Sequence, residues 1–458
     1  MSVNAGQLIE SRKNAVLVVG LGKTGYSAIQ HFCEEGHSVV AVDTRQGTPY
    51  LSRVRDEFPD VQIHCGAFEE DMFRGFETVL VSPGVPLEDP AIQCALKCGA
   101  DVIGDVELFA RNNDRPVIAI TGSNGKSTVT QLVGDMLNAA GINALVGGNL
   151  GVPALELLRH ALPDVYVLEL SSFQLEATRS LEPVSAVVLN ISEDHMDRYP
   201  TLEAYRQAKA SIYRHCSGCV VNRDDPGAGP DESASCHHQV TFGNGAPAND
   251  SEFGFADALG ETWIFQGKTA LMRCSETELT GRHNLLNIQA AMALITAAGY
   301  DLDRDMLDVV GGFAGLSHRM QTVVVSQGVR WINDSKGTNV GATSAALEGL
   351  SEPVILIAGG QGKDADFEPL AVASQERVRS ALVFGEDGHK ISNALSEACP
   401  VQVVQDLRQA VQSAQAMATS GDVVLFSPAC ASFDMFANFE ARGNAFCDLV
   451  YEVTQCRQ

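Results

Sequence analysis

The sequence predicts an α/β protein with three domains, each built around a mainly parallel sheet. Three observations support this prediction. The chain has 458 residues, which exceeds the size of one ordinary hydrophobic core. Short apolar, β-branched runs alternate with segments of helical periodicity, as they do in βαβ units. Many of these runs end in turns that carry glycine, serine or lysine, which is typical of strand ends that line a ligand crevice.

We place the domains at residues 1–104, 105–314 and 315–458. The first and third are expected to be Rossmann-like, and the second is expected to hold a parallel sheet of the P-loop ATPase type. Residues 223–280 are rich in glycine, aspartate and serine, which predicts an antiparallel appendage of short strands. The glycine-containing stretch 311–316 is the expected hinge before the third domain.

The first domain opens with a nucleotide-binding pattern. An apolar run at 15–19 leads into Gly20-Leu-Gly-Lys-Thr-Gly25, a helical segment follows, and the next strand ends in an acid, Asp43. This strand–turn–helix–strand context makes the glycine motif a Rossmann fingerprint. A third strand at 78–81 ends in Ser82-Pro-Gly84, which is expected to line the same crevice.

The second domain carries a P-loop variant in Thr121-Gly-Ser-Asn-Gly-Lys-Ser-Thr128, directly after the apolar run 117–120. A glycine-rich turn between a strand and a helix lets backbone N–H groups approach phosphate oxygens at the positive end of the helix. Lys126 adds a charge for the β- and γ-phosphates, and the Ser127 hydroxyl is placed to bind Mg²⁺. Ile120 stands where the Walker pattern has a glycine. The motif predicts that the protein binds and splits a nucleoside triphosphate.

Polar residues follow two further strands of the second domain. Glu169 ends the run 165–170, and His195 follows the run 186–190 in an acidic loop. Beside a P-loop, both are candidate ligands for hard cations that would neutralise phosphate charge. The alternatives are that Glu169 caps the next helix and that His195 is a hydrogen-bonded turn residue. Lys209 lies on an ordinary amphipathic helix, and composition alone predicts a solvated surface lysine there.

The third domain carries polar residues at three strand ends. Lys336 and Thr338 follow the run 329–333, and Lys363 and Ser432 follow two other runs. Each residue alone could serve turn chemistry. Together, two lysines and two hydroxyls predict a pocket that binds carboxylates.

Composition limits the partners and the compartment. The net charge of −25 argues against nucleic acid and anionic membrane surfaces. Residues 1–10 lack a secretory signal, and no run of about 18 apolar residues predicts a membrane span. The 12 cysteines are scattered, and Cys33, Cys94, Cys430 and Cys447 lie among apolar residues, which predicts free thiols in a reducing cytoplasm.

One cysteine cluster leaves an alternative open. His215, Cys216 and Cys219 could form a zinc site only with a second ligand pair from 236–238. Incidental loop and strand-edge residues are the favoured interpretation. Nothing in the sequence requires more than a monomer.

Taken together, these residues resemble the Mur ligase family, the ATP-dependent amide-forming enzymes of peptidoglycan precursor synthesis. The resemblance covers nearly the whole chain and rests on the motifs at 121–128, 168–176, 193–198, 281–284, 317–319 and 333–336. Family P-loops of this type also lack the first Walker glycine. The stretches 20–25, 169–176, 427–434 and 438–443 resemble the branch of the family that adds D-glutamate.

The resemblance implies ligation of D-glutamate to UDP-N-acetylmuramoyl-L-alanine through an acyl phosphate, with ADP and phosphate as products. The first domain would then hold the uridine nucleotide, and the third would bind the amino acid and close over ATP. Implied catalytic residues are Lys126, His195, Lys209, Arg319 and Lys336. Implied ATP contacts are Gly122, Ser123, Asn124, Gly125, Lys126, Ser127, Thr128, Asn287, Arg319 and Asp334.

The resemblance assigns the other substrates and the metal in the same way. Implied contacts of the UDP-sugar are Lys23, Thr24, Asp43, Thr44, Arg45, Ser82, Gly84, Asn149 and His195. Implied contacts of D-glutamate are Thr338, Lys363, Ser432, Phe433 and Phe439. Two Mg²⁺ ions are implied, held by Ser127, Glu169, His195 and Lys209, the last carbamylated by CO₂. Relatives often carry an apolar residue at position 23 and a leucine at position 433.

Four rival interpretations use part of these features. An NAD-dependent oxidoreductase would leave the P-loop and the third domain unexplained. A folylpolyglutamate synthase normally lacks the first Rossmann unit. A Mur ligase that adds another amino acid would share the ATP site but differ in the pocket. A non-enzymatic nucleotide-binding regulator would not need ligand-type residues at every strand end.

Overall fold

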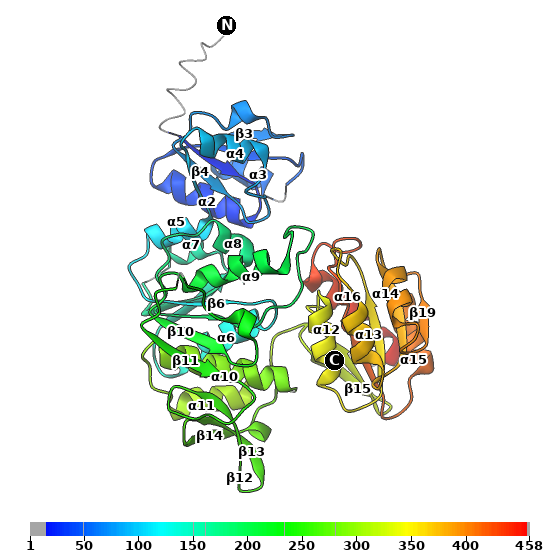
Figure 1. Ribbon diagram of the computed structural model, residues 1–458. Coiled ribbons are helices and arrows are strands. Elements are labelled where there is room, and N and C mark those ends of the chain that lie inside the picture. The colour runs from blue at the N-terminus through cyan, green and yellow to red at the C-terminus, as the bar shows by residue number, and fades with distance from the viewer. Residues whose placement is uncertain are drawn as a thin grey trace.

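The computed structural model describes residues 15–455, apart from residues 49, 150, 161, 233 and 280. Residues 1–10, on which the expectation about a secretory signal rests, lie outside this part. Figure 1 shows three α/β units: the N-terminal unit in blue, the central unit in cyan to green and the C-terminal unit in yellow to red, which lies beside the central one. No helix in the described part of the chain is long and apolar enough to span a bilayer.

The N-terminal unit is a five-stranded parallel sheet in the order β3-β2-β1-β4-β5. Its strands are β1 (Ala15–Val19), β2 (Ser38–Asp43), β3 (Gln62–Cys65), β4 (Thr78–Val81) and β5 (Asp101–Ile103), and its helices are α2 (Lys23–Glu34), α3 (Leu51–Glu57) and α4 (Pro90–Lys97). The strand order is that of a Rossmann sheet, whose ligand crevice lies where the order of the strands reverses, between β1 and β4.

The central unit is a six-stranded parallel sheet in the order β11-β10-β9-β6-β8-β7. Its strands are β6 (Val117–Thr121), β7 (Ala144–Gly148), β8 (Val165–Glu169), β9 (Ser185–Val188), β10 (Gly218–Asn222) and β11 (His238–Phe242). Its helices are α5 (Asp105–Arg111), α6 (Lys126–Ala139), α7 (Ala154–Leu157), α8 (Ser172–Glu176), α9 (Leu202–Ala210), α10 (Arg282–Ala297) and α11 (Arg304–Gly312). Strand β6 is completely buried because its apolar side chains pack on both faces of the sheet.

The predicted antiparallel appendage is present but shorter than expected. It comprises β12 (Phe253–Ala258), β13 (Glu261–Gln266) and β14 (Thr269–Arg273), which extend from the central unit in Figure 1. Strand β11, which the sequence analysis placed in this appendage, instead pairs parallel to β10 and extends the central sheet. Its Val240 and Phe242 are buried against the apolar helix α10, which explains the difference.

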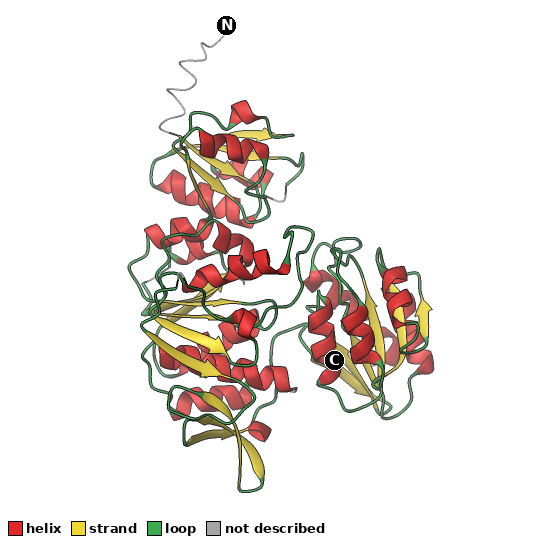
Figure 2. Ribbon diagram, viewed as in Figure 1, coloured by secondary structure: helices red, strands yellow, loops and turns green. Residues whose placement is uncertain are grey.

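The C-terminal unit is a six-stranded sheet in the order β15-β16-β20-β17-β18-β19. Its strands are β15 (Gln321–Ser326), β16 (Val329–Asn333), β17 (Val354–Gly359), β18 (Val378–Phe384), β19 (Val401–Val403) and β20 (Val423–Phe426). Only β15 runs antiparallel to its neighbour. Its helices are α12 (Val340–Glu348), α13 (Glu368–Ser374), α14 (Gly388–Leu395), α15 (Leu407–Met417) and α16 (Phe439–Thr454). Figure 2 shows helices covering the sheet.

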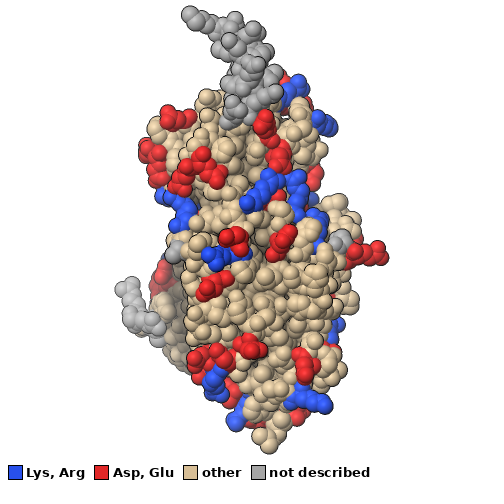
Figure 3. Space-filling model, turned by 90° about the vertical axis from the view of Figure 1, so that its left-hand side faces the viewer, with Lys and Arg blue, Asp and Glu red and all other residues tan. Residues whose placement is uncertain are grey.

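The distribution of the cores separates the C-terminal unit from the other two. One apolar cluster contains residues of both the N-terminal and central units, and the rings of Phe109 and Tyr166 meet in it edge to face at 5.1 Å. The C-terminal sheet has clusters of its own. On the face drawn in Figure 3, Asp and Glu are interspersed with Lys and Arg, and uncharged atoms make up most of the surface.

Candidate active site

The carboxyl ends of the central and C-terminal strands border one cavity of about 680 Å³. Most of the predicted site residues line it: Ser123, Asn124, Gly125, Lys126, Ser127, Thr128, Asn149, Glu169, His195, Asn287, Arg319, Asp334, Lys336, Thr338, Lys363, Ser432, Phe433 and Phe439. Gly122 and Lys209 lie directly behind the wall, joined by a 2.9 Å hydrogen bond from the Lys209 ammonium to the Gly122 carbonyl. The fold therefore brings together residues that are more than 300 positions apart.

The P-loop connects β6 to α6 in a conformation that depends on glycine. Gly122 and Gly125 have φ of +148° and +85°. A Cβ on Gly125 would lie 2.5 Å from the Asn287 side-chain oxygen, so α10 packs tightly against the loop. The ammonium of Lys126 donates to the carbonyls of Gly122 and Ser123, at 2.8 and 2.9 Å. Burial lowers its pKa, against the opposing charge of Glu169.

Ile120 explains why the Walker glycine is dispensable here. It is still part of β6, is fully buried, and pairs with Glu169 and Val187 on the neighbouring strands. The loop begins at Gly122, one residue after the strand ends, so position 120 needs an apolar side chain rather than conformational freedom.

The carboxylate of Glu169 fits a cation site. The side chain is 1% exposed at the end of β8, and one oxygen accepts a 2.6 Å hydrogen bond from the Asn149 amide. The other oxygen, Oε2, has no hydrogen-bond partner among the described residues. Burial acts to raise the pKa of Glu169, but the charge of Lys126 and the hydrogen bond from Asn149 help to lower it. A buried, ionised oxygen without a donor suits Mg²⁺, which prefers carboxylate ligands.

Lys209 corrects the prediction made from composition alone. Its side chain is 2% exposed rather than solvated, although it lies on the amphipathic helix α9. The amine lies 4.6 Å from the ring centre of Tyr205 and donates to the P-loop carbonyl of Gly122. Burial lowers the pKa of this amine well below its usual value, and the nearby charge of Lys126 adds to the effect. A neutral amine is the form of lysine that can react with CO₂.

His195 sits in the loop after β9 with φ of +58°, an uncommon conformation for a residue other than glycine. Its ring meets that of Phe173 at 4.8 Å, and its Nε2 lies 3.7 Å from a carboxylate oxygen of Asp194. Burial lowers the pKa of His195 to about 4, against the opposing charge of Asp194. The imidazole is therefore neutral at pH 7 and able to bind a metal.

Arg319 links the C-terminal unit to the P-loop, and Asp334 lies near it at the end of β16. The Arg319 guanidinium donates to the Ser127 hydroxyl at 3.2 Å. Asp334 accepts from the Ser427 hydroxyl at 2.7 Å and from the Met320 backbone at 3.2 Å. Burial raises the pKa of Asp334 to about 6.

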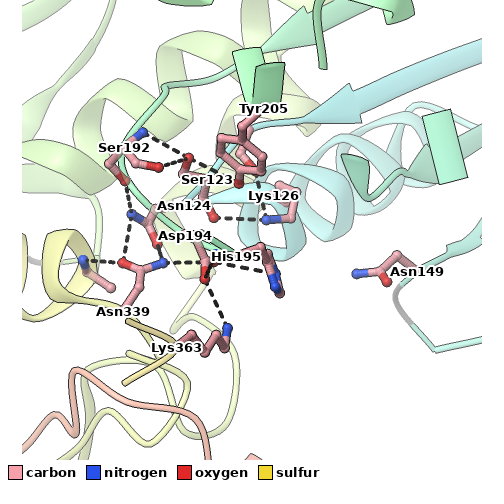
Figure 4. Close-up of polar contacts among 12 residues, drawn as sticks. Ser123, Asn124, Lys126, Asn149, Ser192, Asp194, His195, Tyr205, Asn339 and Lys363 are labelled. Atoms are coloured by element: carbon pink, nitrogen blue, oxygen red, sulfur yellow. Dashed lines mark hydrogen bonds and ion pairs between the residues drawn. The ribbon is translucent and has the colours of Figure 1, made fainter. Parts of the chain in front are cut away.

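The predicted carboxylate pocket lies on the same side of the cavity. The ammonium of Lys336 lies 3.9 Å from the ring centre of Phe439, and burial lowers its pKa to about 8. Ser432 is 3% exposed, whereas the adjacent Phe433 is 70% exposed at the cavity wall. Lys363 forms a 2.9 Å ion pair with Asp194 (Figure 4). Lys336, Lys363 and Ser432 thus line one cavity, and carboxylate binding there stays a prediction.

The seven residues predicted for the uridine nucleotide in the first domain do not line this cavity. They lie at the carboxyl ends of β1, β2 and β4 in the N-terminal unit. The carboxylate of Asp43 accepts from the Leu21 backbone at 2.7 Å and from Arg45 at 2.8–2.9 Å, so it fixes the first turn and aims Arg45. Thr24 lies in the first turn of α2, Thr44 and Gly84 follow β2 and β4, and Ser82 donates to the Gly20 carbonyl at 3.2 Å.

Two contacts tie these turns to the central unit. Arg198, in the His195 loop, donates to the backbone carbonyls of Pro83 and Val85 at 3.0 and 3.4 Å. The ammonium of Lys23 donates to the carbonyl of Gly151, in the loop that follows Asn149. A ligand seated on the N-terminal turns would therefore adjoin the cavity.

The cysteines follow the prediction only in part. Cys33, Cys94, Cys430 and Cys447 are free, and two of them, Cys94 and Cys430, are buried. Cys219 and Cys236 form a disulfide, which the expectation of free thiols did not foresee and which uses two of the candidate zinc ligands. Among the described residues, no group of three or more His, Cys, Asp or Glu side chains could hold a metal ion.

Two residues of the cavity were missed as functional candidates. Asp194 is adjacent to His195 in the acidic loop, and Asn339 caps α12. The Asn339 amide donates to Asp194 at 3.2 Å and exchanges longer hydrogen bonds with Asn124. The acidic loop itself was the only signal in the sequence, because these partners come from another domain.

The fold and the cavity define a nucleotide-binding α/β protein in which a P-loop and a cationic pocket face the same space. Three family models match in order: the Mur ligase MurD-like N-terminal domain at 14–104, the Mur ligase middle domain at 120–295 and the Mur ligase glutamate ligase domain at 318–430. The chain belongs to the Mur ligase family.

Two curated relatives cover nearly the whole chain. The UDP-N-acetylmuramoylalanine–D-glutamate ligase of Nitrosococcus oceani is 48% identical over 96% of this chain and 97% of its own length. The enzyme of the same name from Marinobacter nauticus is 48% identical over 95% of this chain and 97% of its own length. A MurF ligase from Thermotoga maritima in complex with ADP shares the fold, with a TM-score of 0.62 and 17% identity over 99% of this chain and 97% of its own.

Proposed function

We propose that this protein ligates D-glutamate to UDP-N-acetylmuramoyl-L-alanine, with conversion of ATP to ADP and phosphate, in peptidoglycan precursor synthesis. The observation that carries the proposal is the single cavity in which the P-loop faces Lys336, Lys363 and Ser432. A dicarboxylic amino acid suits that cationic wall. The names of the curated relatives, at 48% identity, point to the same reaction.

Each unit would bind one substrate. We place the limits between the three domains after residues 104 and 314. The N-terminal unit would hold the uridine nucleotide near Arg45 and Ser82. The peptide end of the sugar would then reach Asn149 at the rim of the cavity. ATP would lie on the P-loop with Asn287 beside it. The third unit would supply the amino-acid pocket and close by movement around residues 311–316.

In the first step, an oxygen of the alanyl carboxylate attacks the γ-phosphorus of ATP, and the bond to the β-phosphate oxygen breaks. ADP leaves, and an acyl phosphate remains. Lys126 and Arg319 would stabilise the charge that spreads over the transferring phosphoryl group. Arg319 reaches Ser127 at 3.2 Å, which puts its charge beside the loop that would hold the β- and γ-phosphates.

In the second step, the neutral amine of D-glutamate attacks the carbonyl carbon of the acyl phosphate. The tetrahedral intermediate breaks its bond to the phosphate oxygen, so that phosphate leaves and an amide forms. The ammonium group loses one proton to the medium before the attack and a second one as the amide forms, so that the amide nitrogen keeps one hydrogen. Lys336 would hold a carboxylate of D-glutamate. The ring of Phe439 packs against the ammonium group of Lys336 and limits where that group can point. Because both reactants would be bound in one cavity, the attack would become an effectively unimolecular step.

Three residues of the cavity wall and Lys209 behind it would hold two Mg²⁺ ions. Ser127 and Glu169 would hold one, and His195 and a carbamylated Lys209 would hold the other. When bound, Mg²⁺ would neutralise phosphate charge. The burial of Lys209 and the unpaired Glu169 oxygen support this assignment. We further propose a monomeric cytoplasmic enzyme without a nucleic-acid or membrane partner.

Release of ADP and phosphate tests the proposal. The purified protein would receive Mg·ATP, UDP-N-acetylmuramoyl-L-alanine and one amino acid from a panel. We expect turnover with D-glutamate and none with L-glutamate, L-alanine or a diamino acid. Turnover with another amino acid would keep the ligase mechanism and overturn the pocket assignment. Absence of turnover with every acceptor, in a folded protein that binds ATP, would favour a regulator.

A further inference from the structure

The ion pair between Asp194 and Lys363 crosses the cavity between two domains. Asp194 comes from the loop after β9 of the central unit, and Lys363 comes from the loop after β17 of the C-terminal unit. The distance between the Asp194 oxygen and the Lys363 nitrogen is 2.9 Å, and the two side chains are only 10% and 15% exposed. Both residues line the wall of the cavity, so the pair occupies space in which a ligand would sit.

Asp194 is held in place by contacts other than Lys363. Its second oxygen accepts a hydrogen bond from the Asn339 amide at 3.2 Å, and Asn339 in turn contacts Asn124 of the P-loop (Figure 4). The first oxygen also accepts from the backbone of His195 at 3.0 Å. The carboxylate would therefore keep its position if Lys363 turned to another partner.

An acidic amino acid needs two kinds of partner. Its carboxylates need cations, which the cavity supplies in Lys336 and Lys363. Its ammonium group needs an anionic acceptor. Three other carboxylates line the cavity. The unpartnered oxygen of Glu169 lies beside the P-loop, where it suits a cation that accompanies phosphate, and Asp334 is bound by Ser427 and Met320. The third, Glu440, is exposed.

Asp194 is thus the carboxylate whose present partner is a lysine of the amino-acid pocket. The pair of opposite charges on Asp194 and Lys363 matches the pair carried by the amino acid. Exchange of partners would keep every charge neutralised: a carboxylate of the ligand takes Lys363, and its ammonium group takes the oxygen that Lys363 leaves. No charge would be buried without a partner at the end of the exchange, which is the costly outcome.

We propose that Asp194 is the binding residue for the ammonium group of the acidic amino acid, and that the ligand enters by replacing Lys363 as its partner. This inference rests on the proposed function, because it assigns an amino acid to the cavity. It concerns binding, and the later loss of the proton before attack is a separate event. It also gives the pocket a reason to reject dicarboxylates that lack an amine.

The test is Asp194→Asn, which keeps the shape and the hydrogen bond to Asn339 but removes the charge. We expect the KM for D-glutamate to rise about 10- to 100-fold, the range for loss of one hydrogen bond between charged groups. The change in kcat should be smaller, and the KM for ATP should stay within about twofold. Asp197→Asn, an exposed acid of the same loop, is the matched control and should behave as the wild type.

A second readout separates this role from a structural one. Glutarate has two carboxylates and no amine, so in the wild type it must break the ion pair without offering a replacement for Lys363. Its competitive inhibition constant should fall about tenfold in Asp194→Asn, because Lys363 is then free, while the KM for D-glutamate rises. In Lys363→Met the inhibition constant for glutarate should rise instead. A variant damaged in its fold would weaken both ligands together.

The outcomes are distinct. Opposite shifts for D-glutamate and glutarate in Asp194→Asn support the proposal. An unchanged KM for D-glutamate, or a parallel loss of both ligands, overturns it. If the wild type shows no turnover with D-glutamate, the proposed function fails first, and this result is recognised before any variant is compared.

Discussion

Replacing Arg442 with methionine should destabilise the C-terminal unit and loosen the amino-acid pocket. Arg442 lies in the first turn of helix α16, is fully buried, and donates to the carbonyls of Cys430, Ala431 and Ser335 at 2.9–3.1 Å. Its Nε also donates to the Ser335 hydroxyl at 3.1 Å. One guanidinium therefore joins the loop that carries Lys336 to the loop that carries Ser432.

The size of the loss in stability follows from the carbonyl groups that lose their hydrogen-bond donor when Arg442 is replaced. Ala431 keeps a hydrogen bond from the Gln361 backbone, and the Ser335 hydroxyl still donates to the Phe439 carbonyl. The carbonyls of Cys430 and Ser335 have no other hydrogen-bond partner in the described part of the chain. A buried acceptor without a partner costs about 1–3 kcal/mol, so we expect a loss of roughly 2–6 kcal/mol.

Tryptophan fluorescence can measure this loss in one unit. The chain has two tryptophans, and Trp331 is buried in β16 of the C-terminal sheet. In a Trp263→Phe background, urea unfolding followed at Trp331 reports on that sheet. Arg408→Met is the matched control, because Arg408 forms an exposed ion pair with Glu452 that should contribute at most about 1 kcal/mol. Equal stability of the two arginine variants would refute the reasoning.

Three further predictions use other parts of the cavity. Lys209→Ala should lose turnover and regain part of it with a short-chain carboxylate, and full activity without rescue would contradict the carbamate. Asp334→Asn should remove a dependence of folding stability on pH. Burial raises the pKa of Asp334 from 3.8 to about 6, so the folded state binds the proton of this carboxyl group more tightly than the unfolded state does. Wild-type stability relative to that variant should therefore fall by roughly 3 kcal/mol between about pH 4 and 6 in urea titrations, and parallel curves would disprove it. Arg198→Met, which removes the donor to the carbonyls of Pro83 and Val85, should raise the KM for the UDP-sugar about tenfold and leave that for ATP unchanged, and equal effects on both would exclude a specific link.

The parallel strands were predictable because burial on both faces produces apolar runs. Strands β6 and β8 are completely buried, and the apolar runs 117–120 and 165–170 each end within one residue of the observed strand. The short edge strands β3 and β19 were missed, since half-exposed sequences such as Gln62–Cys65 carry no apolar run. The P-loop was predictable from its local sequence, because backbone conformation and phosphate binding both depend on the same glycines.

The contacts between domains were not predictable from local sequence. Composition assigned Lys209 to the surface, yet packing of α9 beneath the P-loop buries it. The Asp194–Lys363 pair joins residues 169 positions apart, and neither loop contains a local sequence pattern that predicts contact with the other.

These contacts share one physical feature. Lys363 is charged, lies in a loop, and pairs with a residue of another domain. The unfavourable free energy of burying its charge is therefore offset only when the two domains are in contact. Arg319 likewise reaches the P-loop hydroxyl of Ser127 from the C-terminal unit. Because that unit has its own cores, closure need not disturb its packing. Under the proposed function, a ligand that supplies the same charges would compete with the interdomain contacts, and occupancy of the cavity would be coupled to the position of the third unit.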